Sequence, residues 1–358
     1  MLGPPQCGMG TLRFLLALSV AYGHLAVPLQ FPTSDIAVQS FFVVSGFYMA
    51  LVLNEKYGPD EYWLFISNRL LRLWPAYIVV LVLSLMTASN WKLIGTLDWS
   101  AIAFFAASQI LIVGQDLYLF MFVDGERLAF TAHIAEMSKP LYSFAPIPQA
   151  WSLGPEICFY LLAPFIVRRG PKPIAAIIAV SLMVRMGLQW AFGFSGNPWS
   201  FRFFPSEIAL FLAGSLGYYV CAGRDETQRN QAKLLLTAAA AALFVCLAIN
   251  RWDGVERLAS LALLAAVTLG VPRLFQMTRN FELDKYVGEL SYPLYICHYL
   301  FGWMLEPNTF AGVYLSLVLS LAMSVALYHF VDRPVDLWRQ NRLKRQRGPT
   351  VGQLIPSV

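Results

Sequence analysis

Residues 36–53 read IAVQSFFVVSGFYMALVL, eighteen consecutive positions without a charged side chain. A helix needs about 20 mostly apolar residues to cross the hydrocarbon core of a bilayer, so this stretch is typical of a membrane span. Similar runs flank it at residues 13–30, 73–89, 151–168, 174–194, 203–222, 232–250, 256–275, 286–305 and 311–331. The pattern predicts an all-α fold, a polytopic transmembrane helical bundle of about ten spans.

The composition agrees with this prediction. The 358-residue chain is 58% hydrophobic and 13% charged, whereas a typical soluble domain has about 25% charged residues. This excludes a soluble globular protein, and basic cytoplasmic loops explain the net charge of +5 better than nucleic-acid binding does. The five cysteines form no Cys-x-x-Cys pair, so we expect neither a disulfide framework nor a zinc site.

The distribution of basic residues predicts the topology. With ten spans, nineteen Lys and Arg fall on the side that holds both termini and six on the other, which places both termini in the cytoplasm. The shorter apolar stretch 101–114 is expected to be re-entrant or interfacial. We divide the chain into a transmembrane domain at 1–340 and a basic cytoplasmic tail at 341–358 that meets lipid headgroups.

Ionisable side chains within spans are costly, so each is a candidate functional residue. Arg13 and His24 are eleven positions apart on the first span, which puts them on nearly one face and about 16 Å apart along the axis. Counting from the span ends gives His24, Glu156, Glu207 and His298 similar depths. We therefore predict a buried polar site in which Glu156 lies within hydrogen-bond reach of His24, directly or through one water, with Glu207 as the alternative acid.

The segment RLLRLWP at 69–75 places two arginines three residues apart on one helix face. With Arg13 at a similar depth, such a pair is suited to bidentate hydrogen bonds with phosphate. The same spacing also fits arginines that merely extend to the membrane interface, and this alternative stays open. Small residues among aromatics in FFVVSGF at 41–47, and the pair Gly214 and Gly217, are typical of close helix packing.

Taken together, six motifs resemble the acyltransferase-3 family of membrane acyltransferases. They extend over about residues 11–340, and Gly154-Pro155 departs from the Ser-Val-like pair that is common in the family. In chain order the motifs are Arg13 with His24 in an R-x10-H arrangement, FFVVSGF at 41–47, RLLRLWP at 69–75, WSL at 151–153 with Glu156 and FY at 159–160, LSYPLY at 290–295 with His298, and DRP at 332–334.

The resemblance implies transfer of an acyl group, usually acetyl from acetyl-CoA, to an extracytoplasmic or lipid-linked carbohydrate. It makes His24 the catalytic base and Arg13 a donor-binding or charge-stabilising residue. We expect Glu156 to orient the His24 ring and to stabilise its imidazolium. We assign donor binding to Arg13, Arg69, Arg72, Ser45, Tyr292 and His298.

The expected partners follow from this reaction. They are an acyl-CoA donor, a carbohydrate or lipid-linked glycan acceptor, and membrane lipids, with no metal and no nucleic acid. The expected location is a plasma membrane, for this chain the inner membrane of a bacterium.

Three alternatives remain from the sequence. A covalent acyl intermediate on Ser45 or Cys297 would need an adjacent base, which the sequence does not indicate. A transporter without chemistry would also bury charged residues, but it should show repeat symmetry that this chain lacks. A purely structural protein predicts that replacing His24 changes no phenotype, and CoA release with and without saccharide acceptors separates the enzyme from the transporter.

Overall fold

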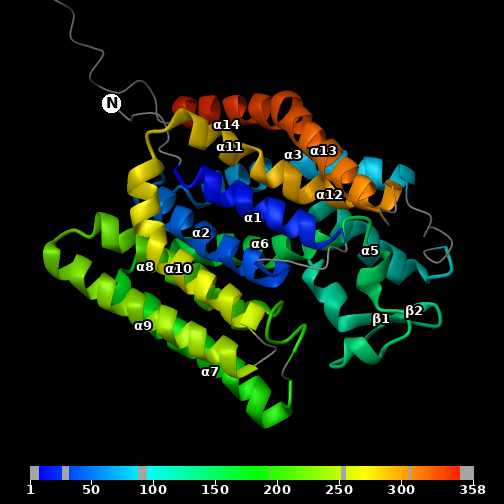
Figure 1. Cartoon of the computed structure of the whole chain (residues 1–358), viewed down its shortest axis with the longest axis horizontal. Coiled ribbons are helices and arrows are strands. Elements are labelled where there is room, and N and C mark those ends of the chain that lie inside the picture. The colour runs from blue at the N-terminus through cyan, green and yellow to red at the C-terminus, as the bar shows by residue number, and fades with distance from the viewer. Residues whose placement is uncertain are drawn as a thin grey trace, which may run out of the picture.

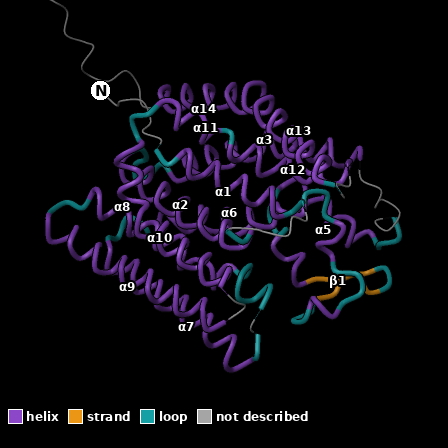
Figure 2. The backbone as a smooth tube through the Cα atoms, in the orientation of Figure 1, coloured by secondary structure: helices purple, strands orange, loops and turns teal. Residues whose placement is uncertain are grey.

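A computed structural model describes residues 8–25, 32–87, 95–194, 196–250, 255–305 and 309–346. Helices pack side by side in a bundle, with a small β-hairpin at one end (Figures 1 and 2). This confirms the predicted all-α class. The helices are α1 (Gly10–Gly23), α2 (Ser34–Glu55), α3 (Tyr62–Thr87), α5 (Trp99–Leu111), α6 (Leu153–Ile166), α7 (Pro171–Phe192), α8 (Phe204–Ala222), α9 (Glu226–Asn250), α10 (Val255–Thr278), α11 (Glu282–Glu289), α12 (Ser291–Leu305), α13 (Phe310–Leu327) and α14 (Arg333–Gln346).

Nine of the ten predicted spans each coincide with one helix, and the span 286–305 is divided between the end of α11 and α12. Residues 26–30 of the first span and 88–89 of the third lie outside the described residues. In the described ranges, seven helices are long and apolar enough to cross a membrane. The other three are α1, α6 and α12, with 14, 14 and 15 residues. At 1.5 Å per residue they span about 21–23 Å, less than the roughly 30 Å hydrocarbon core.

These three short helices carry three of the four polar residues predicted at one depth, and the fourth, Glu207, lies in the longer helix α8. His24 is the C-cap of α1, Glu156 lies in the first turn of α6, and His298 lies in α12. A 3₁₀ turn at Pro148–Ser152 precedes α6, and Leu290 separates α12 from α11. Helices that stop or break inside a bundle bring polar groups to a membrane depth that continuous spans fill with apolar side chains.

The helices α2 and α8 form the centre of the bundle, where their backbones touch. A Cβ added to Gly46 would lie 1.7 Å from the carbonyl oxygen of Phe211, and one added to Gly214 would lie 1.8 Å from that of Val43. Only glycine fits at either position, which confirms the packing interpretation of Gly214. This contact fixes the orientation of the α2 face that carries Ser45.

The start of α1 is anchored to α11. The carboxylate of Asp284 accepts hydrogen bonds from the backbone N–H groups of Gly10 at 2.7 Å and Thr11 at 2.8 Å. These donors have no partner within the helix, and a negative charge there favours the positive end of the helix dipole. The anchor fixes the position of Arg13, one turn further along α1.

A small unit stands at one end of the bundle. Helix α5 corresponds to the predicted segment 101–114, and the Trp74 indole N–H on α3 donates to the carbonyl oxygen of Ile110 at 2.8 Å. Strands β1 (Met121–Asp124) and β2 (Arg127–Phe130) pair antiparallel, and Met121 lies opposite Phe130. These strands are not predicted by the hydrophobic pattern, although Asp124-Gly125 is a hairpin-turn signal and Gly125 has a φ of 61°.

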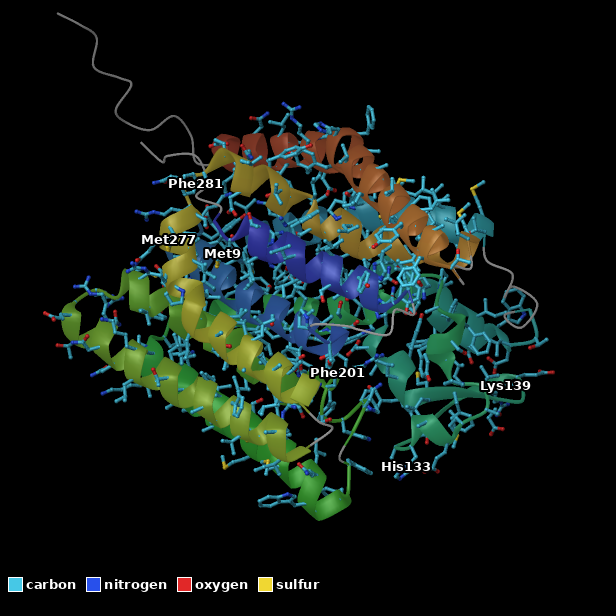
Figure 3. All side chains as sticks on the ribbon, viewed as in Figure 1. Met9, His133, Lys139, Phe201, Met277 and Phe281 are labelled. Carbon is cyan, nitrogen blue, oxygen red and sulfur yellow. The ribbon has the colours of Figure 1, made fainter. Side chains whose placement is uncertain are left out.

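The bundle thus has two ends that we name by their elements. The hairpin end carries β1, β2 and the α7–α8 loop, where Phe201 is labelled in Figure 3. The α14 end carries the start of α1, α11 and α14, and Met9 and Phe281 are labelled there. Helix α14 continues through Gln346 and so crosses the expected domain boundary at 340/341, whereas residues 347–358 of the expected tail lie outside the described residues.

Candidate active site

A cavity of about 280 Å³ lies at the hairpin end of the bundle. His24 lines it from the end of α1, and Phe201, labelled in Figure 3, lines it from the α7–α8 loop. Amides and aromatic rings dominate the rest of the wall, together with the Arg257–Asp35 ion pair. The other lining residues are Ser34, Val38, Gln39, Gln149, Trp151, Asn197, Ser200, Arg202, Leu247 and Tyr295.

The two histidines predicted at one depth meet in a hydrogen bond. His24 Nδ1 lies 2.9 Å from His298 Nε2, and the ring planes are within 6° of parallel. His298 is buried at 1% exposure, and its Nδ1 lies 2.8 Å from the carbonyl oxygen of Tyr295. A chain of two hydrogen bonds therefore connects the carbonyl oxygen of Tyr295 to His298, and His298 to His24 at the cavity wall.

This chain of contacts fixes the tautomers of the neutral pair. A carbonyl oxygen only accepts hydrogen bonds, so His298 carries its proton on Nδ1 and its Nε2 is an acceptor. His24 must then donate from Nδ1, and its Nε2 is an acceptor that has no hydrogen-bond partner among the described residues. In this state the atom that is free to take a proton is Nε2 of His24.

Arg202 is the second notable group of the cavity. Its guanidinium carbon lies 4.5 Å from the Trp151 ring centroid and 5.4 Å from that of Phe201. Its buried Nε has no hydrogen-bond partner, and among the described residues no carboxylate forms an ion pair with it. Burial lowers the pKa of this guanidinium to about 10, so it stays charged at neutral pH.

Among the described residues, no direct hydrogen bond joins His24 to Glu156. Glu156 accepts hydrogen bonds from Ser45 Oγ at 3.0 Å and from the Tyr160 hydroxyl. The physical reason is that the helices carrying the two residues have mostly different neighbours. Helix α6 packs against α2, α3 and α8, whereas α1 packs against α2, α11 and α12. Depth counting placed the two groups in one layer but did not identify their neighbours, and His298 occupies the place expected for the acid.

Glu207, the alternative acid, is also engaged elsewhere. It is fully buried in an ion pair with Arg185 of α7, and Gln39 Nε2 lies 3.2 Å from both of its oxygens. Arg185 also donates to the carbonyl oxygen of Ser206 at 2.8 Å. This buried pair fixes Gln39, whose side chain lines the cavity, and has no described contact with His24.

A second cavity, of about 180 Å³, lies at the α14 end. Of the residues assigned to donor binding, Arg72 and Tyr292 line it, with Arg72 Nη2 3.2 Å from Glu289 Oε2. The Tyr292 hydroxyl donates to the carbonyl oxygen of Leu73 at 2.6 Å. Its other lining residues are Leu71, Lys285, Tyr328, Asp332, Arg333, Asp336, Leu337, Arg339 and Gln340.

The remaining residues assigned to donor binding line neither cavity. The Arg13 guanidinium lies 5.9 Å from the Tyr48 ring centroid, and Arg69 is 8% exposed with a buried Nε that lacks a partner. Ser45 is held by Glu156 within the bundle. His298 pairs with His24 at the opposite end from Arg72, so the structure separates it from the arginines with which it was grouped.

Cys297, one residue considered for a covalent intermediate, packs away from both cavities. Its buried Sγ lies 3.4 Å from the carbonyl oxygen of Ser320 on α13. Across the described ranges, no group of three or more His, Cys, Asp or Glu side chains is arranged to hold a metal ion.

Sequence reasoning missed Arg202 as a site residue and counted it only as an outer basic residue. A signal was available, because an arginine on the side with few basic residues runs against the positive-inside pattern. The turn residue Gln149 was missed as well, because it precedes the predicted helix. Its Nε2 lies 2.7 Å from the carbonyl oxygen of Ile296 and so ties the cavity wall to α12.

Comparison with known proteins gives the family. The model of a family described as an acyltransferase domain matches residues 8–329, and the chain belongs to this family. The match covers both short helices that bear the histidine pair and ends just before α14. No solved structure matches the chain.

Two relatives illustrate the distance to known proteins. An uncharacterized protein of Aquifex aeolicus is 24% identical over 202 residues, covering 54% of this chain and 90% of the relative. The O-acetyltransferase OatA of Staphylococcus aureus is 22% identical over 363 residues, covering 92% of this chain and 57% of the relative. The chain thus aligns with little more than half of the second protein.

Proposed function

We propose that this chain transfers an acetyl group from acetyl-CoA to a hydroxyl group of a carbohydrate at the outer face of a bacterial inner membrane. Membership of the acyltransferase family and the likeness to an O-acetyltransferase support the reaction class. The observation that carries the proposal is the histidine pair, in which His24 lines a polar cavity that Arg202 also lines and keeps Nε2 as an acceptor without a partner among the described residues.

The chemistry assigned to the site is general-base acyl transfer. His24 Nε2 takes the proton of the acceptor hydroxyl as the oxygen attacks the thioester carbon, which forms a tetrahedral intermediate. Arg202 stabilises the oxyanion, because a charge fixed in a buried site favours the charge that develops on the thioester oxygen. When the carbon–sulfur bond breaks, the His24 imidazolium returns its proton to the CoA thiolate, and the acceptor leaves as an ester.

The cavity wall supports a carbohydrate acceptor. The amides of Gln39, Gln149 and Asn197 supply paired donors and acceptors for sugar hydroxyls, and the rings of Trp151 and Phe201 supply apolar surface. The volume of about 280 Å³ suits a small part of a glycan. We therefore assign the hairpin-end cavity to the acceptor hydroxyl and its sugar.

The donor is assigned to the opposite end. Helix α12 lines the α14-end cavity with Tyr292 and the hairpin-end cavity with Tyr295, so one helix connects both. CoA carries its phosphates and its thioester at opposite ends of a long arm, which matches arginines at one end and His24 at the other. With the α14 end in the cytoplasm, as the basic residues indicate, the thioester reaches His24 from within the bundle.

The test is acceptor-dependent CoA release by the purified chain in nanodiscs. We expect acetyl-CoA to yield free CoA and an acetylated product when saccharides from a panel of oligosaccharides are supplied. His24→Ala should abolish both signals. Acetyl-CoA that stays intact with every acceptor, or release that is equal in the His24 variant, would contradict the proposal and favour the transporter.

A further inference from the structure

Helix α14 forms a wall of the α14-end cavity, although the family match stops at residue 329. Half of the residues that line the cavity lie beyond that point. The helix packs against α3, whose Leu71 and Arg72 form the facing wall. The residues from beyond the match are Asp332, Arg333, Asp336, Leu337, Arg339 and Gln340.

Within this wall Arg339 is unusually buried for a residue of a basic terminal helix. It is 8% exposed, its Nη1 donates to Asp336, and its buried Nε has no partner. On the facing helix Arg69 is also 8% exposed, and its Nε also lacks a partner. The Nε atoms of Arg185, Arg202 and Arg257 also lack partners, so this feature alone marks no site. What favours an anion here is its combination with a cavity that Arg339 lines and with further basic side chains around it.

The charges around the cavity do not cancel. The basic side chains that line it are Arg72, Lys285, Arg333 and Arg339, and the acidic ones are Glu289, Asp332 and Asp336. Arg69 on α3 does not line the cavity but is close enough to act electrostatically on Arg339, and it is counted as a fifth basic group. Two ion pairs, Arg72–Glu289 and Arg339–Asp336, hold guanidinium groups at the wall. The excess of two positive charges matches a phosphate monoester, which carries about −1.5 to −2 at neutral pH.

We propose that α14, α3 and α11 form a phosphate-binding site in which Arg339 binds the phosphate directly. The assignment rests on the proposed function for the source of the phosphate, which is the CoA moiety of the donor. The cavity of about 180 Å³ is smaller than the roughly 300–1,000 Å³ of pockets for drug-sized ligands, so it suits one end of the donor. The headgroup of an anionic lipid offers the same chemistry and is the alternative source.

The test compares two ligands on the full chain in phosphatidylcholine nanodiscs by calorimetry. Arg339→Gln should raise the Kd of CoA about tenfold or more, the effect of losing one charge-assisted hydrogen bond. It should leave the Kd of S-acetylpantetheine, which has no phosphate, unchanged. The matched control is Arg342→Gln on the same helix, because the Arg342 guanidinium lies 5.9 Å from the Trp338 ring centroid and does not line the cavity.

A variant that is expected to increase the affinity for CoA distinguishes an effect on binding from damage to the fold. Asp336→Asn removes the carboxylate that competes with phosphate for Arg339, so CoA should bind about twofold to fivefold more tightly. A misfolded variant would not gain affinity. Equal losses for both ligands in Arg339→Gln, or weaker CoA binding in Asp336→Asn, would overturn the assignment.

A short-chain phosphatidylglycerol distinguishes the two phosphate sources. Loss of its binding in Arg339→Gln with unchanged CoA binding assigns the site to a lipid headgroup, and unchanged binding of both ligands overturns the site.

The phosphate site and the proposed function can fail independently of each other. If the wild-type chain binds CoA through Arg339 but acetylates no acceptor, the proposed function is wrong and the phosphate site is supported. If acetylation proceeds and Arg339→Gln binds both ligands normally, the site fails alone.

Discussion

The two cavities differ in how their charges are compensated. At the α14 end, basic and acidic side chains alternate in ion pairs such as Arg72–Glu289. The hairpin-end cavity also holds one ion pair, Arg257–Asp35, but its wall adds a hydrogen-bonded histidine pair and Arg202, which forms no ion pair among the described residues. Clustered basic side chains are suited to holding a charged ligand, whereas a histidine base beside a guanidinium outside any ion pair is suited to bond rearrangement. This difference agrees with the proposed division, in which the donor phosphates bind at the α14 end and the reaction takes place at the hairpin end.

The largest expected effect comes from removing the proposed base at the hairpin end. His24→Ala should lower kcat for acetyl transfer by about 10²- to 10⁴-fold, the usual contribution of a general base. The Kd of CoA should stay within about twofold, because the donor phosphates bind at the other end. CoA-release rates and calorimetry measure the two effects. His133→Ala, an exposed histidine of the hairpin end, is the control, and loss of CoA affinity in His24→Ala would make His24 a ligand contact instead.

A second prediction concerns stability. Arg185→Leu leaves Glu207 buried without its partner, which should lower the free energy of unfolding by about 3–5 kcal/mol. The double variant Arg185→Leu/Glu207→Leu should recover most of this loss, because no charge remains buried. Denaturant unfolding in detergent measures both. If the single variant is as stable as the wild type, the pair does not brace the hairpin-end cavity.

Arg202 tests whether the uncompensated charge at the hairpin end acts in the reaction. Arg202→Gln should lower kcat by about 10²- to 10³-fold, as loss of an oxyanion donor does elsewhere, with little change in CoA affinity. Arg202→Lys should retain part of the rate because it keeps the charge. Arg127→Gln is the matched control, since this side chain on β2 is 85% exposed. A change in acceptor KM with normal kcat would instead assign Arg202 to acceptor binding.

His298 is a positioning residue in this account, and its effect should be the smallest. His298→Leu removes the acceptor for His24 Nδ1–H and should lower kcat about tenfold. His298→Gln offers a side-chain oxygen to the same proton and should restore much of the rate. A purely structural role predicts no such difference, so equal rates in the two variants would contradict the tautomer assignment.

The fold was largely predictable because hydrophobic length acts locally. Each apolar run became helical, and Gly214 lies at a close backbone contact as its small size indicated. The hairpin was missed because its two four-residue strands sit in a polar connection where only Asp124-Gly125 signals a turn. Short strands in a loop leave almost no periodic pattern to read.

The site was less predictable because the depth of a residue along its helix does not show which other helices pack beside it. Depth counting gave His24 and His298 similar depths without predicting the hydrogen bond between them, and it paired His24 with Glu156, which belongs to a helix that packs elsewhere. Arg202 lies in a loop whose path depends on the whole bundle. Arg339 belongs to a helix whose sequence resembles a plain basic tail, and only packing against α3 makes it a cavity residue.

The central claim is that the acetyl group travels from a donor at the α14 end to a hydroxyl at the hairpin end. Labelled acetyl-CoA, which does not cross membranes, is added to inverted and to right-side-out vesicles from cells that express the chain. The account predicts label on envelope saccharides in inverted vesicles only, with none in the His24→Ala strain. Labelling in right-side-out vesicles, or labelling that survives in His24→Ala, would contradict it.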